Sequence, residues 1–227
     1  MIRAVIFDMF ETLITHHEAP LYFGEQIAQD AGIPPGAFLS LWRPTERDRS
    51  IGKLSFEETV RRILLEHERY SRELLSAIVK KRARAKKACF EHLHPQILPM
   101  LSSLKERGIL IGLISNCYSE EVVPIRESVL FPCFDACCLS YELGVQKPDE
   151  AIFSRCMDAL GVTPRECLYV GDGGSSELEA ARALGMRAYQ ATWYFKDGPA
   201  SHFPRKEGFI QLEQPLHVLR YLQAAFT

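Results

Sequence analysis

Short apolar runs alternate with longer segments of helical periodicity in the second part of the chain. After residue 94, apolar runs of strand length lie at residues 109–114, 136–139, 167–170 and 187–191. Gly108, Gly161 and Gly185 end the helical segments that precede three of them. A further apolar run covers residues 3–7. Regular alternation of this kind predicts a doubly wound α/β fold, a parallel sheet covered by helices on both faces.

The segment from about residue 18 to residue 93 has helical periods and no clear strand. Four helices are expected there: one from Pro20 to Gly32, one over residues 36–47, one over residues 55–68 and one from Ser71 through the basic stretch 80–87. Ser55 and Glu58 have the spacing of a capping box at the start of the third. We therefore predict a core of residues 1–15 and 94–227, with an all-helical domain of residues 16–93 inserted after the first strand.

Composition and charge narrow the class of protein. The formal net charge is -2, so no global basic field attracts nucleic acid. The basic stretch 80–87 has no interleaved aromatic residues and has acidic neighbours, which favours a solvated helix face. No apolar run approaches the roughly 20 residues of a membrane span, and the N-terminus lacks the order of a signal peptide. A cytoplasmic protein is expected, and its seven irregularly spaced cysteines are interpreted as free, mostly buried thiols.

Polar residues follow four of the predicted strands or their loops. Asp8 ends the run Val5-Ile6-Phe7, Ser115 and Asn116 follow residues 109–114, and Lys147 comes after the short run 136–139. Asp172 follows residues 167–170, with Glu177 five positions later. Taken singly, Asp8, the Ser-Asn pair and the stretch around Asp172 are typical of helix caps or turns, and a lone Lys-Pro is usually at the surface. Ligands of open parallel sheets bind beyond the carboxyl ends of the strands, so we expect these side chains to gather at one site.

As an ordered series, these motifs resemble the haloacid dehalogenase superfamily of hydrolases. The resemblance rests on Phe7-Asp8-x-x-x-Thr12-Leu13, Ile114-Ser115-Asn116, Gly144-Val145-Gln146-Lys147-Pro148-Asp149 and Val170-Gly171-Asp172-x-x-x-x-Glu177. It extends along essentially the whole chain. It implies a Rossmann-like core, and the inserted helices correspond to the helical cap of one subgroup.

The resemblance also implies roles for the motif residues. Asp8 is expected to attack the substrate and form an aspartyl-phosphate that water hydrolyses. Mg²⁺ is the implied cofactor, with Asp8, Asp172, Glu177 and the backbone carbonyl of Phe10 as ligands. Lys147 balances this negative cluster and holds the nucleophile and the transferred group. Phosphate-binding residues are expected to be Thr12, which orients the loop carrying Asp8, together with Ser115, Asn116 and Lys147.

Phe10 departs from the family pattern. Most phosphatases of the superfamily have a second Asp at this position, which protonates the leaving alcohol and is worth about 10²–10⁴ in rate. Three explanations stay open. Another group substitutes, with Glu11, His16 and His17 as candidates; the leaving group needs no acid; or the bond cleaved is carbon–halogen or carbon–phosphorus. Haloacid dehalogenases proper have an aromatic residue here and need no metal, whereas phosphonoacetaldehyde hydrolases keep Mg²⁺ and use a cap lysine, for which Lys53 is a candidate.

A basic turn in the helical segment bears on the substrate. Arg43, Arg47, Arg49 and Lys53 are crowded beside Trp42. If this turn faces the active site, it selects anionic substrates. The alternative is a solvated turn, balanced by Glu46 and Asp48.

The leading hypothesis is a Mg²⁺-dependent phosphatase of a small phosphorylated metabolite. The alternatives are a 2-haloacid dehalogenase-like or phosphonatase-like hydrolase, or a phospho-ligand-binding protein with little catalysis. The expected partner is a small anionic, phosphorylated substrate. The sequence carries no signal for nucleic acid, for a membrane or for a particular oligomeric state.

Overall fold

A computed structural model describes residues 1–195 and 204–222. The parts 196–203 and 223–227 of the predicted core range lie outside the described residues. A six-stranded parallel sheet has the order β3-β2-β1-β4-β5-β6. Its strands are β1 (Ala4–Phe7), β2 (Leu110–Ser115), β3 (Ala136–Leu139), β4 (Cys167–Gly171), β5 (Arg187–Ala191) and β6 (Ile210–Leu212). This sheet confirms the predicted α/β class; the three-residue edge strand β6 was not predicted.

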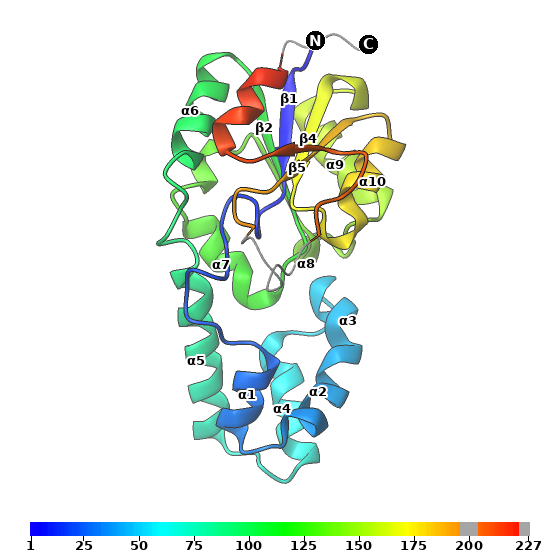
Figure 1. Cartoon of the computed structure of the whole chain (residues 1–227). Helices are drawn as coiled ribbons and strands as arrows, with labels where there is room; N and C mark the ends of the chain where they lie inside the picture. The colour runs from blue at the N-terminus through cyan, green and yellow to red at the C-terminus, as the bar shows by residue number, and fades with distance from the viewer. Residues whose placement is uncertain (196–203, 223–227) are drawn as a thin grey trace.

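Helices cover both faces of the sheet (Figure 1). Side chains alternate along β1, so Val5 and Phe7 pack with α6, α7 and η5, whereas Ala4 and Ile6 pack with α9 and α10. The core helices are α6 (Ile97–Glu106), α7 (Ser119–Glu127), α8 (Ser140–Leu143), α9 (Glu150–Leu160) and α10 (Glu177–Ala183). Short 3₁₀ helices are η2 (Phe131–Cys133), η3 (Pro164–Glu166), η4 (Gly174–Ser176) and η5 (Pro215–Tyr221).

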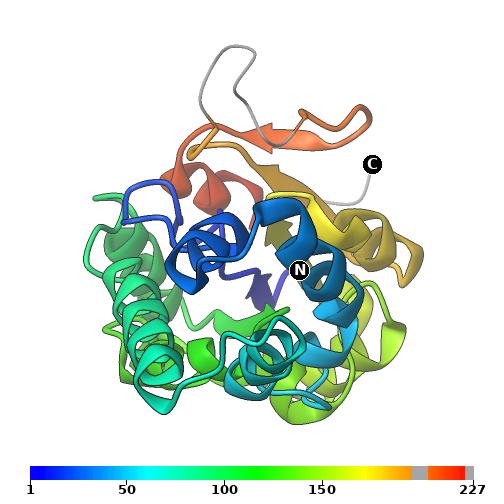
Figure 2. The ribbon, with the colours of Figure 1, turned by 90° about the horizontal axis from the view of Figure 1, so that it is seen from below.

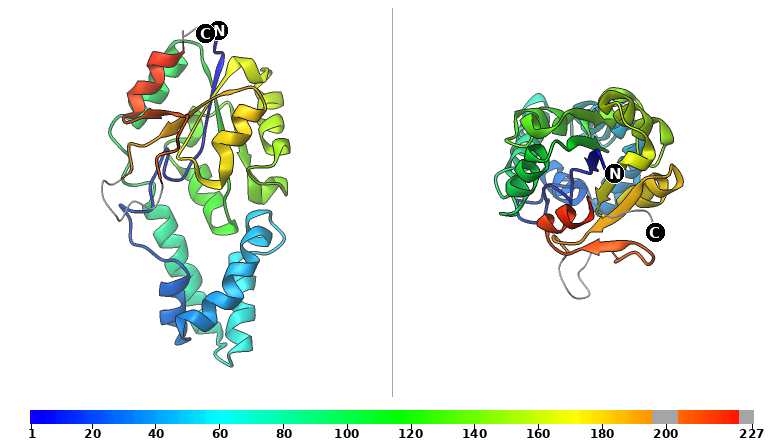
Figure 3. Two further views of the ribbon diagram at one scale, coloured as in Figure 1. Left: turned by 45° about the vertical axis from the view of Figure 1, so that its right-hand side comes forward. Right: turned by 90° about the horizontal axis from the view of Figure 1, so that it is seen from above.

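Five α-helices and one 3₁₀ helix separate β1 from α6, and we call this segment the helical insertion. They are α1 (Gly24–Ala31), α2 (Pro35–Trp42), η1 (Arg43–Thr45), α3 (Glu46–Ser50), α4 (Phe56–Glu66) and α5 (Arg72–Ala88). The insertion extends from the end of the sheet opposite the N-terminus (Figures 1 and 3), and from below it lies in front of β1 (Figure 2). A hydrophobic cluster of its own, which includes Ile27, Phe38 and Leu64, packs between its helices.

Two predicted helix boundaries were wrong. The first helix begins at Gly24 rather than at Pro20, and the backbone N–H of Phe23 is capped by the Gln26 side chain at 2.9 Å. The second does not run as one α-helix over residues 36–47. Pro44 has no N–H to donate, and the chain passes from α2 through the 3₁₀ turn η1 into α3.

The basic stretch is only partly a solvated face. Lys80, Lys81, Arg84 and Lys87 are exposed, as predicted, but Arg82 and Lys86 are each only 3% exposed. Arg82 pairs with Glu120 at 3.0 Å and Lys86 with Glu121 at 2.6 Å, both on α7. Buried charges need partners, and these two ion pairs connect the insertion to the core.

The cysteines agree with the prediction, since all seven are free and five of them are buried. Within the described part of the chain, no helix is long and apolar enough to cross a membrane.

Candidate active site

Asp8 lies where the strand order reverses. The chain adds β2 and β3 on one side of β1 and β4, β5 and β6 on the other. At such a switch point the loops after neighbouring strands diverge and leave a crevice at the carboxyl ends. Phe7 pairs with Val170, and the backbone N–H of Asp8 donates to the Val170 carbonyl at 2.9 Å. Asp8 after β1 and Asp172 after β4 therefore leave adjacent strands at the same level.

Three buried carboxylates meet at this point. Oxygens of Asp8, Asp172 and Glu177 all lie within 4.8 Å of one another. The ammonium of Lys147 contacts Asp8 Oδ1 and Glu177 Oε2. Tyr169 donates its hydroxyl to Glu177 Oε2 at 2.8 Å. The structure thus brings together the four charged residues that the sequence placed at the site.

The carboxylates repel one another in a poorly solvated place. Burial, followed by the charge of Glu177, raises the pKa of Asp8 to about 7. Burial and the charges of Glu177 and Asp8 raise the pKa of Asp172 to about 8. Burial disfavours the Lys147 ammonium, but Asp8 and Glu177 outweigh it and raise the Lys147 pKa. One ammonium against three carboxylates leaves an excess of negative charge, and this all-oxygen donor set fits a bound Mg²⁺.

Thr12 and Asn116 position the charged residues. The Thr12 hydroxyl lies 3.5 Å from Asp8 Oδ2, and the Thr12 carbonyl accepts from Trp193 Nε1 at 2.8 Å. Asn116 Oδ1 accepts from the Lys147 backbone N–H at 2.8 Å, and Asn116 Nδ2 donates to the Lys147 carbonyl at 3.0 Å. This pair of hydrogen bonds fixes the loop that carries Lys147.

Ser115 is fully buried, and its hydroxyl has no hydrogen-bond partner among the described residues. Neither Ser115 nor Thr12 is among the described residues that line the two cavities at the site. Asn116 lines both of them.

The candidates for the missing acid are engaged in hydrogen bonds. The Phe10 ring stacks on His16, with centroids 4.6 Å apart. Glu11 accepts from the Thr15 hydroxyl at 2.5 Å and from the His16 backbone N–H at 2.9 Å. His16 Nδ1 lies 3.1 Å from Glu11, and His16 Nε2 lies 2.7 Å from Lys86 Nζ.

Electrostatics leave Glu11 and His16 poorly suited to donate a proton at neutral pH. Burial raises the pKa of Glu11, but hydrogen bonds from His16 and Thr15 outweigh it and lower that pKa. Burial and the charge of Lys86 lower the pKa of His16. His17 lines the cavity that holds Asp8. Lys53 is exposed and lies 3.8 Å from Asp48, and it is not among the described residues lining either cavity.

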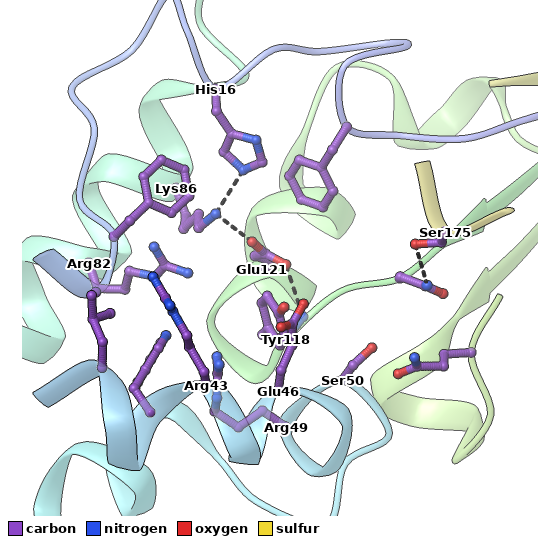
Figure 4. Close-up of a pocket in the computed structure, with 17 residues that line it drawn as sticks. His16, Arg43, Glu46, Arg49, Ser50, Arg82, Lys86, Tyr118, Glu121 and Ser175 are labelled. Carbon is purple, nitrogen blue, oxygen red and sulfur yellow. Dashed lines mark hydrogen bonds and ion pairs between the residues drawn. The ribbon is translucent and has the colours of Figure 1, made fainter. Parts of the chain in front are cut away.

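Two adjoining cavities lie between the sheet and the insertion. The proximal cavity, of about 490 Å³, contains the carboxylate cluster and Lys147. The distal cavity, of about 450 Å³, is bordered by α2, α3 and α5 of the insertion and by the start of α7 (Figure 4). Both are lined by Phe10, His16, Phe23, Asn116 and Ser175. A ligand with one end at Asp8 would therefore have room to extend toward the insertion.

Sequence reasoning missed several residues of the site. Ser175 lines both cavities and accepts from Asn116 Nδ2 at 3.3 Å, and its φ of 52° is in the left-handed region. Its position just after Gly173 and Gly174, in the loop that follows β4, could have indicated that it lies at the site. Tyr169 lies within a buried strand, and Lys86 within a basic run, so neither had a local signal for its contacts in the site.

Gly171 makes room for Glu177. A Cβ added at Gly171 would lie 2.0 Å from Glu177 Oε1 and 2.8 Å from its carboxyl carbon. We expect Gly171→Ala to displace that carboxylate and to lower kcat by about 100-fold or more, because small displacements in a preorganised site are costly. Steady-state kinetics test this. Gly36→Ala, at a helical position with open space, is the control and keeps wild-type activity. Unchanged kinetics in Gly171→Ala would contradict the placement of Glu177.

Comparisons with known proteins identify the family to which this chain is similar. The family model for haloacid dehalogenase-like hydrolases matches residues 2–185. The phosphoserine phosphatase of Thermus thermophilus is 31% identical over 119 residues, which cover 52% of this chain and 45% of that protein. The (S)-2-haloacid dehalogenase 4A of Burkholderia cepacia is 26% identical over 175 residues, 74% of each chain.

A solved structure shares the whole fold. The crystal structure of a phosphatase of this superfamily from Thermococcus onnurineus has a TM-score of 0.68 and 17% identity, and the match covers 98% of each chain. At this identity the likeness concerns the fold alone. The family match spans most of the sequence, from before β1 to just past α10. This chain therefore belongs to the haloacid dehalogenase-like hydrolases.

Proposed function

We propose that the protein is a Mg²⁺-dependent phosphatase of a small phosphorylated metabolite. The observation that carries this proposal is the buried cluster of Asp8, Asp172 and Glu177 around the Lys147 ammonium. The similarity to phosphoserine phosphatase supports it, although that match spans less than half of the relative. We further propose that residues 16–93 form a cap domain, supported by their separate hydrophobic cluster and by their place over the site.

The residues of the carboxylate cluster have different roles in the proposed reaction. An Asp8 oxygen attacks phosphorus, the phosphorus–oxygen bond to the leaving group breaks, and an aspartyl-phosphate forms; water then attacks that phosphorus, which releases phosphate and regenerates Asp8. Asp8, Asp172, Glu177 and the Phe10 carbonyl would hold Mg²⁺. When bound, the ion supplies positive charge that reduces the repulsion between Asp8 and the phosphate. Asp172 is fixed by the Gly174 backbone N–H, which donates to Asp172 Oδ1 at 2.9 Å.

Lys147 and the loop after β2 would bind the phosphate. Lys147 supplies the one ammonium in contact with both Asp8 and Glu177 among the described residues. Ser115, the residue that ends β2, lines neither cavity, but its unpartnered hydroxyl would gain a partner if it donates to a phosphate oxygen at the end of that strand. Asn116 maintains this arrangement through its two hydrogen bonds to Lys147.

Phe10 shapes the kinetics that we expect. A phenyl ring cannot protonate the leaving oxygen, so esters with acidic leaving groups should react faster than alkyl esters. We expect purified protein to release phosphate from a panel of phosphate esters. EDTA should abolish this activity and added Mg²⁺ restore it. Mg²⁺ alone should also raise Tm, because it binds the folded carboxylate cluster.

The panel can contradict the proposal in two ways. One is the absence of phosphate release from every ester, including p-nitrophenyl phosphate, at high protein concentration. The other is turnover that EDTA does not affect. Binding of Mg²⁺ and phosphate esters without turnover would instead indicate a phospho-ligand-binding protein.

A 2-haloacid dehalogenase is the second candidate, and Phe10 is the observation that favours it. The similarity to the Burkholderia enzyme covers 74% of the chain. A carbon–halogen bond needs no acid at position 10, but it also gives no reason to gather Asp172 and Glu177 beside Asp8. Release of chloride from 2-chloropropionate in the presence of EDTA would support this candidate, and no halide release from several haloacids would exclude it.

A further inference from the structure

Four cationic side chains line the distal cavity: Arg43, Arg49, Arg82 and Lys86. Arg82 and Lys86 are neutralised by Glu120 and Glu121, at 3.0 and 2.6 Å. Figure 4 shows the Lys86 ammonium between His16 and Glu121. These two cations therefore serve the junction between insertion and core.

Arg49 is buried without such a partner. It is 2% exposed, and its Nε donates to the Thr45 hydroxyl at 3.1 Å. No carboxylate of the described residues lies within 4.0 Å of its guanidinium. Burial lowers the pKa of Arg49 and outweighs the charges of Glu120 and Glu46, which lie beyond 4.0 Å and raise it. A buried guanidinium that faces a cavity and has no carboxylate in direct contact therefore has room for an anionic partner.

Two aromatic rings hold the guanidinium in place. Its central carbon lies 3.7 Å from the ring centroid of Trp42 in the insertion and 4.7 Å from that of Tyr118 in the core. Such contacts occupy the faces of a guanidinium and leave its edge, where the N–H groups point, for an anion. Arg49 is therefore preorganised for a planar or tetrahedral anion.

The remaining charges of the cavity are uneven. Arg43 and Glu46 also line it, and neither has an ion-pair partner within 4.0 Å among the described residues. With the two ion pairs set aside, two arginines face one glutamate there, an excess of one positive charge. Arg47, on the same helix as Arg49, is exposed and is not among the described residues that line the cavity. Arg49 therefore faces the cavity, whereas Arg47, on the same helix, faces solvent.

We propose that Arg49 binds a second anionic group, a carboxylate or a second phosphate, on the part of the substrate that leaves. This inference rests on the proposed phosphatase function, because it places the scissile phosphate at Asp8. The five residues shared by the two cavities connect that phosphate to Arg49. A bidentate contact with Arg49 then selects phosphorylated compounds that carry another anion.

Matched substrates test the proposal. 2-Phosphoglycolate is compared with 2-hydroxyethyl phosphate, and 3-phosphoglycerate and glycerol 1,3-bisphosphate are each compared with glycerol phosphate. We expect the wild-type protein to favour at least one doubly anionic member by about 10- to 100-fold in kcat/KM, the usual effect of a charge-assisted contact. Preference for the carboxylates or for the bisphosphate identifies which anion Arg49 binds.

Variants assign the preference to Arg49. Arg49→Gln should reduce the ratio to near one, because it raises the KM for the doubly anionic substrates more than the KM for hydroxyethyl phosphate. Arg47→Gln is the matched control and should keep the wild-type ratio. If Arg49→Gln does not fold, Arg49→Lys, which keeps the charge without the bidentate edge, should give an intermediate ratio.

Two results would overturn the inference: equal kcat/KM for matched substrates in the wild-type protein, or an equal loss for all substrates in folded Arg49→Gln. A failure of the proposed function looks different, because no ester, p-nitrophenyl phosphate included, would then release phosphate in the presence of Mg²⁺. In that case, calorimetry can still measure the affinities for 3-phosphoglycerate and glycerol phosphate. A tighter affinity for 3-phosphoglycerate would support the selection of a second anion by Arg49, and equal affinities would overturn this inference.

Discussion

Asp8→Asn is expected to abolish turnover while the protein stays folded. An amide is a poor nucleophile, and removal of a nucleophile from a covalent mechanism costs at least about 10³-fold in kcat. The fold should tolerate the change, because burial and Glu177 raise the pKa of Asp8 to about 7 and thus already disfavour its charged form. Lys147 keeps its contact with Glu177. Phosphate release measures the first effect, and thermal unfolding the second.

Asp172→Asn is the informative companion variant. Its backbone contact with Gly174 can persist, because an amide oxygen also accepts from an N–H group. In a Mg²⁺-dependent phosphatase both variants lose activity, whereas in a metal-independent dehalogenase only Asp8→Asn does. Activity at the wild-type level in folded Asp8→Asn would refute the role of Asp8 in either reaction.

Lys147→Met is expected to lose both activity and stability. It leaves Asp8 and Glu177 buried without their shared ammonium, and removal of one member of a buried ion pair costs about 3–5 kcal/mol of unfolding free energy. Loss of the cation that holds the phosphate should also lower kcat/KM by at least about 100-fold. Denaturant unfolding and phosphate release measure the two effects.

The instability of Lys147→Met should grow with pH. The folded-state pKa values of Asp8 and Asp172, about 7 and 8, lie above the ordinary value of 3.8, so the folded protein binds more protons between these limits. Stability is therefore lost as pH rises from about 4 to about 8. Removal of Lys147 takes away a charge that lowers both pKa values, which makes this loss steeper.

Lys105→Met provides the control. Lys105 pairs with Asp135 at 2.6 Å, but this ion pair is about one-third exposed, so its loss should cost at most about 1 kcal/mol. Equal stability losses in the two variants, or a Lys147→Met protein as stable as the wild type at pH 8, would contradict the account of the buried cluster.

Much of the core was predictable because its signals are local. The runs that became β2 to β5 were located within one residue of their ends, since buried parallel strands are continuous apolar runs. Asp8 and Asp172 could be placed together because the carboxyl ends of parallel strands share one edge of the sheet. The roles of these residues came from the family resemblance, whose motifs occur in order.

The insertion was less predictable at the level of side chains. Its helical character followed from periodicity, but a charged residue on a helix has no local signal for burial. Lys86 and Arg82 are buried because Glu121 and Glu120, more than 30 residues later, lie on α7 opposite them. The local charge pattern predicted that these residues lie on a solvated helix face, but the ion pairs with α7 bury Arg82 and Lys86.

The sequence by itself determined the α/β class, the inserted helices and the order of the reactive motifs, because periodicity and spacing are properties of the chain. Only the tertiary structure decided which side chains face the cavities. It separated Arg49 from Arg47 and Lys53, turned Glu11 toward Thr15 and His16, and brought Tyr169 to Glu177. Such choices depend on which partner each side chain meets after folding, and the spacing of residues along the chain does not specify that partner.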